Sequence, residues 1–131
     1  MLVDKYSRTP LYEQVIAQIE RGILTGELLP GEQIPSVRSL SMELSVNPNT
    51  LQKAYAELER RGLCHSVPGS GRFVSAGAAE RLKSMRRELI GSVAKLAREL
   101  RISGVSEQEL ISAVKSAYAD GVKTPSGQPQ G

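Results

Sequence analysis

The chain has 131 residues, a formal net charge of +3, one cysteine and no tryptophan. The single cysteine excludes an intrachain disulfide, and without an apolar run of about 18 residues a membrane-spanning helix is excluded as well. Residues 1–75 carry eight basic and eight acidic side chains, whereas residues 76–131 carry nine and six, so composition alone does not indicate a DNA-binding half.

The first predicted element is an amphipathic helix over residues 9–25. Thr9 can cap its N-terminus, and Pro10 suits the first helical position, where a backbone N–H has no partner. Gly26 follows where a left-handed residue would end the helix. Apolar residues recur at helical spacing and predict one buried face, formed by Leu11, Val15, Ile16, Ile19, Ile23 and Leu24.

Two further helices are predicted, the first over residues 36–44 and the second from Asn47 to Gly62. Ser36 caps the first helix, and Asn47 followed by Pro48 opens the second. Only Ser45 and Val46 separate them, so the pair is typical of a helix-turn-helix. The inward residues expected in the second helix are Leu51, Ala54, Tyr55 and Leu58.

The pattern changes from helical to alternating after Gly62. Residues 63–67 alternate loosely, residues 68–71 read Pro-Gly-Ser-Gly, and residues 72–74 read Arg-Phe-Val. A turn-rich segment between two strand-like segments predicts a small β-hairpin. Such a hairpin after a helix-turn-helix is called a wing.

A long helix is predicted over residues 79–103, with apolar residues at an average spacing close to the 3.5 of a coiled-coil seam. A last helix starts at Ser106, which forms a capping box with Glu109, and stops at Gly121. The seam could pack within its own chain, but two helices bury little surface, so a symmetric dimer is favoured. The expected dimerisation residues are Leu82, Met85, Leu89, Val93, Leu96, Leu100, Leu110 and Val114.

The predicted fold is therefore mainly α with a small β-hairpin. Residues 1–75 form a winged helix-turn-helix domain, and residues 76–121 form a two-helix dimerisation region. Residues 122–131 have the composition of a disordered tail.

Several motifs in unbroken order over roughly residues 9–75 closely resemble the winged helix-turn-helix domain of GntR-type bacterial transcription regulators. They read Leu-Pro-Gly-Glu-Gln-Ile-Pro-Ser-Val-Arg-Ser-Leu at residues 29–40, Val-Asn-Pro-Asn-Thr-Leu at 46–51, Leu-Glu-Arg-Arg-Gly-Leu at 58–63 and Gly-Ser-Gly-Arg-Phe-Val at 69–74. The short two-helix remainder resembles the YtrA subfamily in length and helix count. The resemblance implies a homodimeric DNA-binding regulator.

The resemblance also implies which residues touch DNA. The Pro-Ser-x-Arg segment supplies Ser36 and Arg38, and the glycine-rich wing tip approaches the minor groove. Where many members carry basic residues before the wing glycines, this chain has Val-Pro, and Arg72 is the nearest positive charge. The residues expected to enter the major groove are Asn47, Asn49, Thr50, Gln52 and Lys53, and those expected at the wing are Gly69, Ser70, Gly71 and Arg72.

The residue types at these positions support the same interpretation on chemical grounds. Side-chain amides such as those of Asn49 and Gln52 can bond both edge atoms of adenine. Thr50, near a helix N-terminus, suits a phosphate, and Arg38 and Lys53 would neutralise phosphates. A solvated helix face is the alternative interpretation, because outward positions of any surface helix are polar.

The sequence thus predicts a cytoplasmic, sequence-specific transcription regulator, a repressor, that binds a roughly palindromic operator as a homodimer. The alternative is a winged-helix module that binds protein or RNA. An enzyme is not expected, because Cys64 and His65 are adjacent in a strand and face opposite ways, and neither a cofactor nor a metal is expected. A small-molecule effector would have to bind at the junction of the two domains or between protomers, since about 50 residues after the wing leave no room for a ligand-binding domain.

Overall fold

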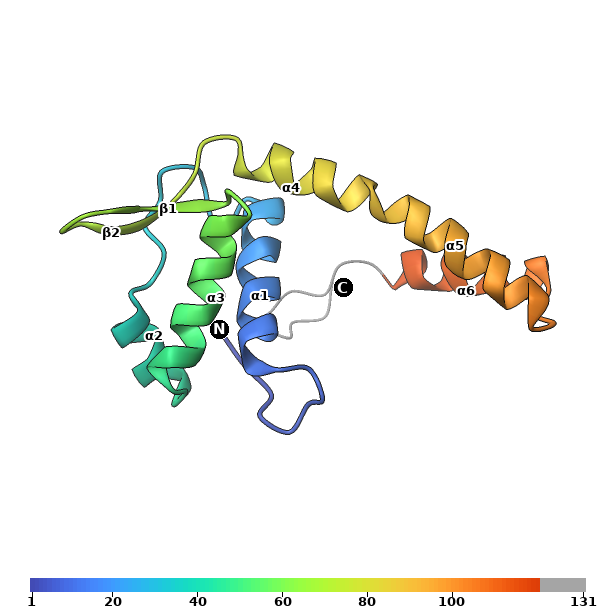
Figure 1. The fold of residues 1–131 in the computed structure, drawn as a ribbon, viewed down its shortest axis with the longest axis horizontal. Coiled ribbons are helices and arrows are strands. Elements are labelled where there is room, and N and C mark those ends of the chain that lie inside the picture. The colour runs from blue at the N-terminus through green and yellow to red at the C-terminus, as the bar shows by residue number, and fades with distance from the viewer. Residues whose placement is uncertain (121–131) are drawn as a thin grey trace. The chain divides into compact units, whose positions relative to one another are not determined.

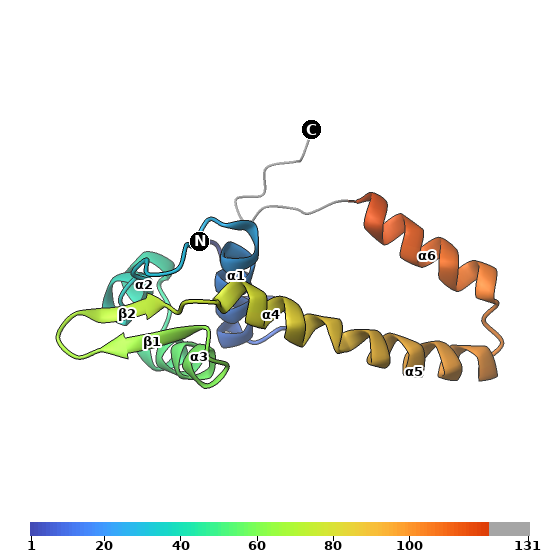
Figure 2. The same cartoon turned by 90° about the horizontal axis from the view of Figure 1, so that it is seen from above.

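The computed structural model describes residues 1–120, which contain six helices and one hairpin (Figures 1 and 2). In chain order these are α1 (Leu11–Thr25), α2 (Val37–Leu44), α3 (Pro48–Arg60), β1 (Cys64–Val67), β2 (Gly71–Val74), α4 (Ala78–Arg87), α5 (Leu89–Ile102) and α6 (Glu107–Ala119). The predicted fold class, mainly α with a small β-hairpin, is confirmed. The predicted stop at Gly121 and the tail over residues 122–131 lie outside the described residues.

The helix-turn-helix is built by the capping residues that the sequence indicated. The Ser36 hydroxyl accepts a hydrogen bond from the Ser39 N–H at 3.0 Å, and the Asn47 side-chain oxygen accepts one from the Asn49 N–H at 2.8 Å. Between the helices, Ser45 adopts a left-handed conformation with φ of 53°, which reverses the chain within two residues. These local contacts fix where α2 ends and where α3 begins.

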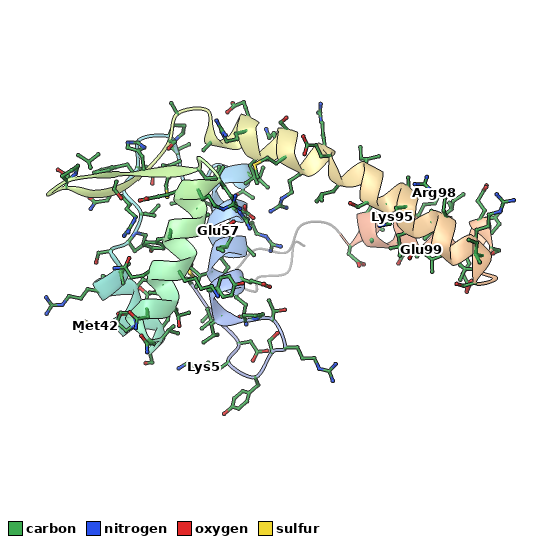
Figure 3. All side chains as sticks on the ribbon, viewed as in Figure 1. Lys5, Met42, Glu57, Lys95, Arg98 and Glu99 are labelled. Atoms are coloured by element: carbon green, nitrogen blue, oxygen red, sulfur yellow. The ribbon has the colours of Figure 1, made fainter. Side chains whose placement is uncertain are left out.

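The N-terminal segment supports the same turn. The Lys5 ammonium donates a hydrogen bond to the Ser45 carbonyl at 2.8 Å (Figure 3). Asp4 and Gln14 exchange two hydrogen bonds, which tie this segment to α1. Ser45 is therefore fixed by the Lys5 side chain as well as by the hydrogen bonds of its own turn.

A single aliphatic core holds the first of two compact units, Met1–Ser84. Helices α1 and α3 lie side by side, and α2 packs against α3 (Figure 1). The inward faces predicted for these helices are confirmed, with Leu11 and Leu24 at the rim of the core rather than inside it. The core consists of Val15, Ile16, Ile19, Ile23, Ile34, Leu40, Leu44, Val46, Leu51, Ala54, Tyr55, Leu58, Leu63, Cys64, Val74, Ala78 and Leu82.

The hairpin gains a third extended segment from the residues that precede α2. Strands β1 and β2 pair antiparallel, with Cys64 opposite Val74. Residues 31–34 run along β2, where the Gly31 N–H donates to the Val74 carbonyl at 2.8 Å and the Ile34 N–H donates to the Arg72 carbonyl at 3.0 Å. These bonds join the wing, which follows the helix-turn-helix in the chain, to the segment that precedes it.

Two helix boundaries differ from the predicted ones. Helix α1 begins at Leu11, with Pro10 at the cap position and no side-chain capping bond, so Thr9 does not cap it. The helix predicted over residues 79–103 is divided at Glu88 into α4 and α5. Glu88 keeps right-handed helical angles, but its carbonyl accepts from the N–H of Gly91, a residue of low helix propensity, so the backbone tightens locally instead of continuing as α-helix.

The described part of the second unit, residues 85–120, lacks an interior of its own. The predicted cap of its last helix is confirmed, because the Ser106 hydroxyl accepts from the Glu109 N–H at 3.1 Å. No residue of α5 or α6 is buried, and the two helices make little contact with each other. Charged residues such as Lys95, Arg98 and Glu99 project from α5 (Figure 3). Within residues 1–120, no helix is both long and apolar enough to span a bilayer.

Candidate nucleic-acid interface

A polar, solvent-exposed face opens helix α3. Leu51 and Ala54 are buried and turn one side of α3 to the core. Asn49 and Gln52 point away from that side and are exposed, and Thr50 is half-buried. Asn47 is exposed too, but its side-chain oxygen is engaged by the Asn49 N–H as the helix cap. The amino end of the Asn47 amide is therefore left for another molecule, whereas Asn49 presents its whole side chain.

Helix α2 contributes one exposed cation beside the polar face. Arg38 lies in the first turn of α2, and within residues 1–120 no carboxylate pairs with it. The hydroxyl oxygen of Ser36 accepts the Ser39 N–H as the cap of α2, which leaves its O–H as a donor for a ligand. Arg38 is therefore the charge in this region best placed to receive an anion.

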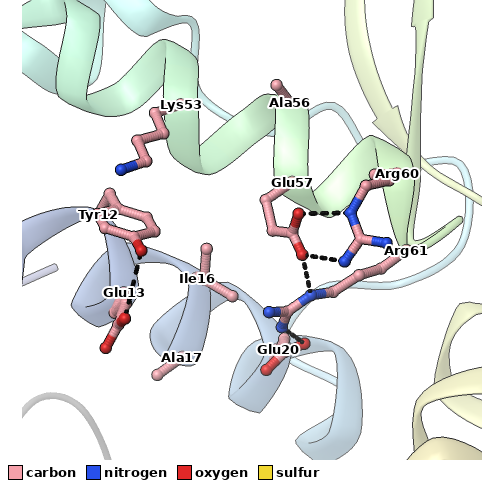
Figure 4. Close-up of a pocket in the computed structure, with 10 residues that line it drawn as sticks. All are labelled: Tyr12, Glu13, Ile16, Ala17, Glu20, Lys53, Ala56, Glu57, Arg60 and Arg61. Atoms are coloured by element: carbon pink, nitrogen blue, oxygen red, sulfur yellow. Dashed lines mark hydrogen bonds and ion pairs between the residues drawn. The ribbon is translucent and has the colours of Figure 1, made fainter.

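Lys53 follows Asn49 by one helical turn, so the two residues share a side of α3. Its ammonium sits 3.8 Å from the centre of the Tyr12 ring of α1, a cation–π contact (Figure 4). It lines the mouth of a pocket of about 610 Å³ between α1 and α3. Lys53 thus stands beside Asn49 and Thr50, with its ammonium turned toward Tyr12 of α1.

Three further charged residues that line this pocket, Glu57, Arg60 and Arg61, are paired with one another. Glu57 accepts two hydrogen bonds of 2.6 Å from Arg60 and one of 2.9 Å from Arg61 (Figure 4). These hydrogen bonds, first from Arg60 and then from Arg61, lower the pKa of Glu57 to about 2. Arg61 also bonds the buried Glu20 of α1 at 2.8 Å. This network joins α1 to α3 and is a structural element rather than an open binding site.

The wing tip consists of Gly69, Ser70 and Gly71, all exposed. Gly71 has φ of 114°, and a Cβ there would lie 2.5 Å from the Gln33 side-chain nitrogen. That nitrogen donates a hydrogen bond to the Ser70 carbonyl at 3.0 Å and so fixes the tip. Sequence reasoning missed Gln33, because 37 residues separate it from Ser70 and no local pattern marks it.

Arg72, one of the residues expected at the wing, turns its side chain toward α3. Its Nε lies 3.0 Å from the Glu59 carboxylate, and its terminal nitrogen donates to the Gln52 side-chain oxygen at 3.3 Å. The guanidinium also lies over the Tyr55 ring at 5.4 Å. Hydrogen bonds from Ser66 and from Arg72 lower the pKa of Glu59. Arg72 therefore joins the wing to α3, and Glu59, which sequence reasoning missed, is its anchor.

Most of the predicted dimerisation residues are exposed apolar side chains. Leu89, Val93 and Leu96 on α5 are each a little more than half exposed, and Met85 and Val114 are also exposed. Leu100 and Leu110 are half-buried. Leu82 is the exception: it is 2% exposed and packs in the core of the first unit, so the exposed seam begins at Met85. Four further large apolar residues of α5 and α6 are exposed, Ile90, Ile102, Ile111 and Tyr118. Helical spacing marked Ile111 and Tyr118 as part of an apolar face, whereas sequence reasoning missed Ile90 and Ile102.

The neighbouring cysteine and histidine of β1 face opposite ways, as alternation predicts. Cys64 is buried, and that burial raises the pKa of its thiol to about 11. His65 is exposed, and its Nδ1 lies 3.0 Å from the Ser75 hydroxyl. Residues 1–120 hold no cluster of three or more side chains that would suit a metal ion.

Comparison with known proteins gives consistent matches. A family model described as bacterial regulatory proteins, gntR family, matches residues 11–74. The HTH-type transcriptional repressor YtrA of Bacillus subtilis (strain 168) is 37% identical over 119 residues, which cover 90% of this chain and 92% of that relative. Among solved structures, a GntR family transcriptional regulator from Listeria monocytogenes has a TM-score of 0.67 and 30% identity, with 87% of this chain and 98% of the other covered. The structure of AraR(DBD) in complex with operator ORX1 has a TM-score of 0.51 and 34% identity, with 57% and 93% covered.

Proposed function

The chain belongs to the GntR family of bacterial regulatory proteins, and on that premise we propose that it represses transcription as a homodimer on a roughly palindromic operator. It is a DNA-binding transcription regulator, as its family and its similarity to an operator-bound domain indicate. The observation that carries the proposal is the exposed polar face that opens α3, next to the exposed Arg38. Double-stranded DNA is the partner that this combination of amides, hydroxyl and cation suits.

The roles within the interface follow from the chemistry of each side chain. Asn49 and Gln52 project from the first two turns of α3 and are assigned to base edges in the major groove. The Thr50 hydroxyl is assigned to a phosphate, because the helix dipole favours an anion at the N-terminus of α3. Arg38 is assigned to a second phosphate. Lys53 is assigned to the DNA backbone, and the wing glycines are assigned to the minor groove.

The proposed dimer rests on the second unit. Helices α5 and α6 expose Leu89, Val93, Leu96 and Val114 and bury nothing. Isolated helices of this length are marginal in water, so an apolar face without an interior favours sharing with a second copy. Two copies would then present two α3 helices to two half-sites.

The test is selection of bound sequences from a random duplex pool, followed by affinity measurements across a salt series. We expect a symmetric consensus and an affinity that falls steeply with salt. Arg38→Ala should weaken binding to all sequences and reduce the salt slope by about one, whereas Asn49→Ala should relax preference at one base pair per half-site. Arg98→Ala, an exposed arginine on α5, is the matched control and should bind as the parent does. A flat salt dependence with no consensus would instead favour a protein-interaction module.

A further inference from the structure

One face of helix α3 meets the wing along a line of three residues. Gln52, Tyr55 and Glu59 are spaced by three and four positions, so they share one side of the helix. Arg72 of β2 contacts all three: the carboxylate of Glu59 at 3.0 Å, the ring of Tyr55 at 5.4 Å and the amide oxygen of Gln52 at 3.3 Å. Gln52, which is assigned to a base edge, is therefore hydrogen-bonded to the wing through Arg72.

The identity of the contacting atoms decides which end of Gln52 remains available. An arginine has only donors, so the amide must turn its oxygen toward Arg72. The amino group of Gln52, which carries two N–H donors, is then the end left to face another molecule. Gln52 itself is exposed, so this donor end is open to a ligand.

Arg72 is itself fixed, which lets it act as a support. Glu59 is ionised at neutral pH, because hydrogen bonds from Ser66 and Arg72 lower its pKa, and this carboxylate competes with any phosphate for Arg72. The backbone of Arg72 is fixed too, since its carbonyl accepts the Ile34 N–H at 3.0 Å. Below it, Tyr55 donates its hydroxyl proton to the Pro35 carbonyl at 2.7 Å, so the ring cannot move aside without breaking that bond.

We propose that Arg72 is a positioning residue that orients Gln52 so that its amino group reads a base edge rich in acceptors, guanine N7 and O6, at one position of each half-site. The inference rests on the proposed DNA-binding function and extends it. Bidentate pairing with adenine needs the amide oxygen and nitrogen together at the base, whereas the Arg72 contact turns the oxygen to the wing. A guanine edge needs donors alone.

The experiment scores base preference separately from overall affinity. Selected half-sites with guanine or adenine at each position are titrated with the parent, Gln52→Ala, Arg72→Ala and Arg72→Met, which keeps an apolar chain over Tyr55. We expect the parent to prefer guanine at one position by between about 5-fold and 100-fold, and all three variants to reduce that preference to about 2-fold or less. The salt slope of the Arg72 variants should equal that of the parent.

Arg60→Ala is the matched control, because Arg60 also pairs with a glutamate of α3 but does not contact Gln52. It should keep the guanine preference. Three results overturn the inference while DNA binding stands: adenine preferred at the Gln52-dependent position, preference unchanged in both Arg72 variants, or a salt slope lowered by about one with preference intact, which is the mark of a phosphate contact. If the parent selects no sequence at all, the proposed function fails and this inference fails with it.

Discussion

A glutamate at position 89 tests whether the apolar face of α5 is shared between two copies of the chain. Leu89 is the first residue of α5 and belongs to its exposed apolar face. A carboxylate at a helix N-terminus is favoured by the helix dipole, and glutamate is a good helix former. Leu89→Glu should therefore leave α5 able to form and act on association alone.

The size of the effect follows from the exposure of Leu89. The side chain is 54% exposed in the single chain, so about half of it remains for a partner to cover. Fully burying a leucine contributes roughly 1.5–3 kcal/mol, which leaves about 1 kcal/mol per copy and about 2 kcal/mol per dimer. Desolvating the new carboxylate costs at least about 1 kcal/mol more per copy. Together these amount to about 4 kcal/mol, which weakens dimerisation roughly 1,000-fold.

Sedimentation equilibrium over a range of protein concentrations measures this change directly. The parent should sediment as a dimer at concentrations where Leu89→Glu sediments as a monomer. Arg98→Ala is the control: it changes the net charge by the same single unit but lies nine residues further on, about two and a half turns and hence on the opposite face of α5. A Leu89→Glu dimer as tight as the parent would refute the shared face, and so would an equal loss in Arg98→Ala.

Three further predictions concern the first unit. Gly71→Ala should destabilise the chain by about 1–3 kcal/mol in urea unfolding, since its Cβ would lie 2.5 Å from the Gln33 amide at a φ of 114°, whereas Gly69→Ala, which meets no atom within 4 Å, should cost less. Burial raises the pKa of Tyr55 from 10.0 to about 12, so the folded state favours the neutral phenol. The contribution of Tyr55 to the free energy of unfolding is therefore full below pH 10 and declines as the pH rises toward 12. Tyr55→Phe should lose about 1 kcal/mol at neutral pH with its hydrogen bond, and urea unfolding at several pH values should show a smaller alkaline decline; a decline equal to the parent's would contradict the assignment. The Cys64 thiol, with its pKa raised to about 11 by burial, should react with a disulfide reagent only as fast as the chain opens, and reaction at the rate of a free thiol would show that it is accessible.

Features of the fold that depend on neighbouring residues were predicted from the sequence. The caps at Ser36, Asn47 and Ser106 each act within three residues, so the residue types alone located those helix starts. The inward face of α3 followed from helical spacing. The division at Glu88 was missed, because a seam pattern sets which residues are apolar but does not show where the backbone tightens.

Features that depend on distant residues were not predicted. Leu82 has the spacing of a seam residue, yet it fills the core of the first unit, and periodicity cannot tell which apolar surface a residue meets. Glu59 and Gln33 each reach the hairpin through side-chain contacts that no spacing rule describes. In the candidate site, Asn49, Gln52 and Lys53 are exposed as expected, whereas the half-burial of Thr50 and the contacts of Arg72 with α3 required the structure.

The way the wing is attached has a consequence for how an operator must be fitted. The hairpin is bonded to residues 31–34 on one side and, through Arg72, to α3 on the other, so wing and reading helix form one stiff body. Such a body cannot remodel itself to suit an irregular duplex. The strain of a poor fit must then fall on the DNA, and flexible pyrimidine–purine steps at base pairs the protein never touches should be favoured over stiff A-tracts.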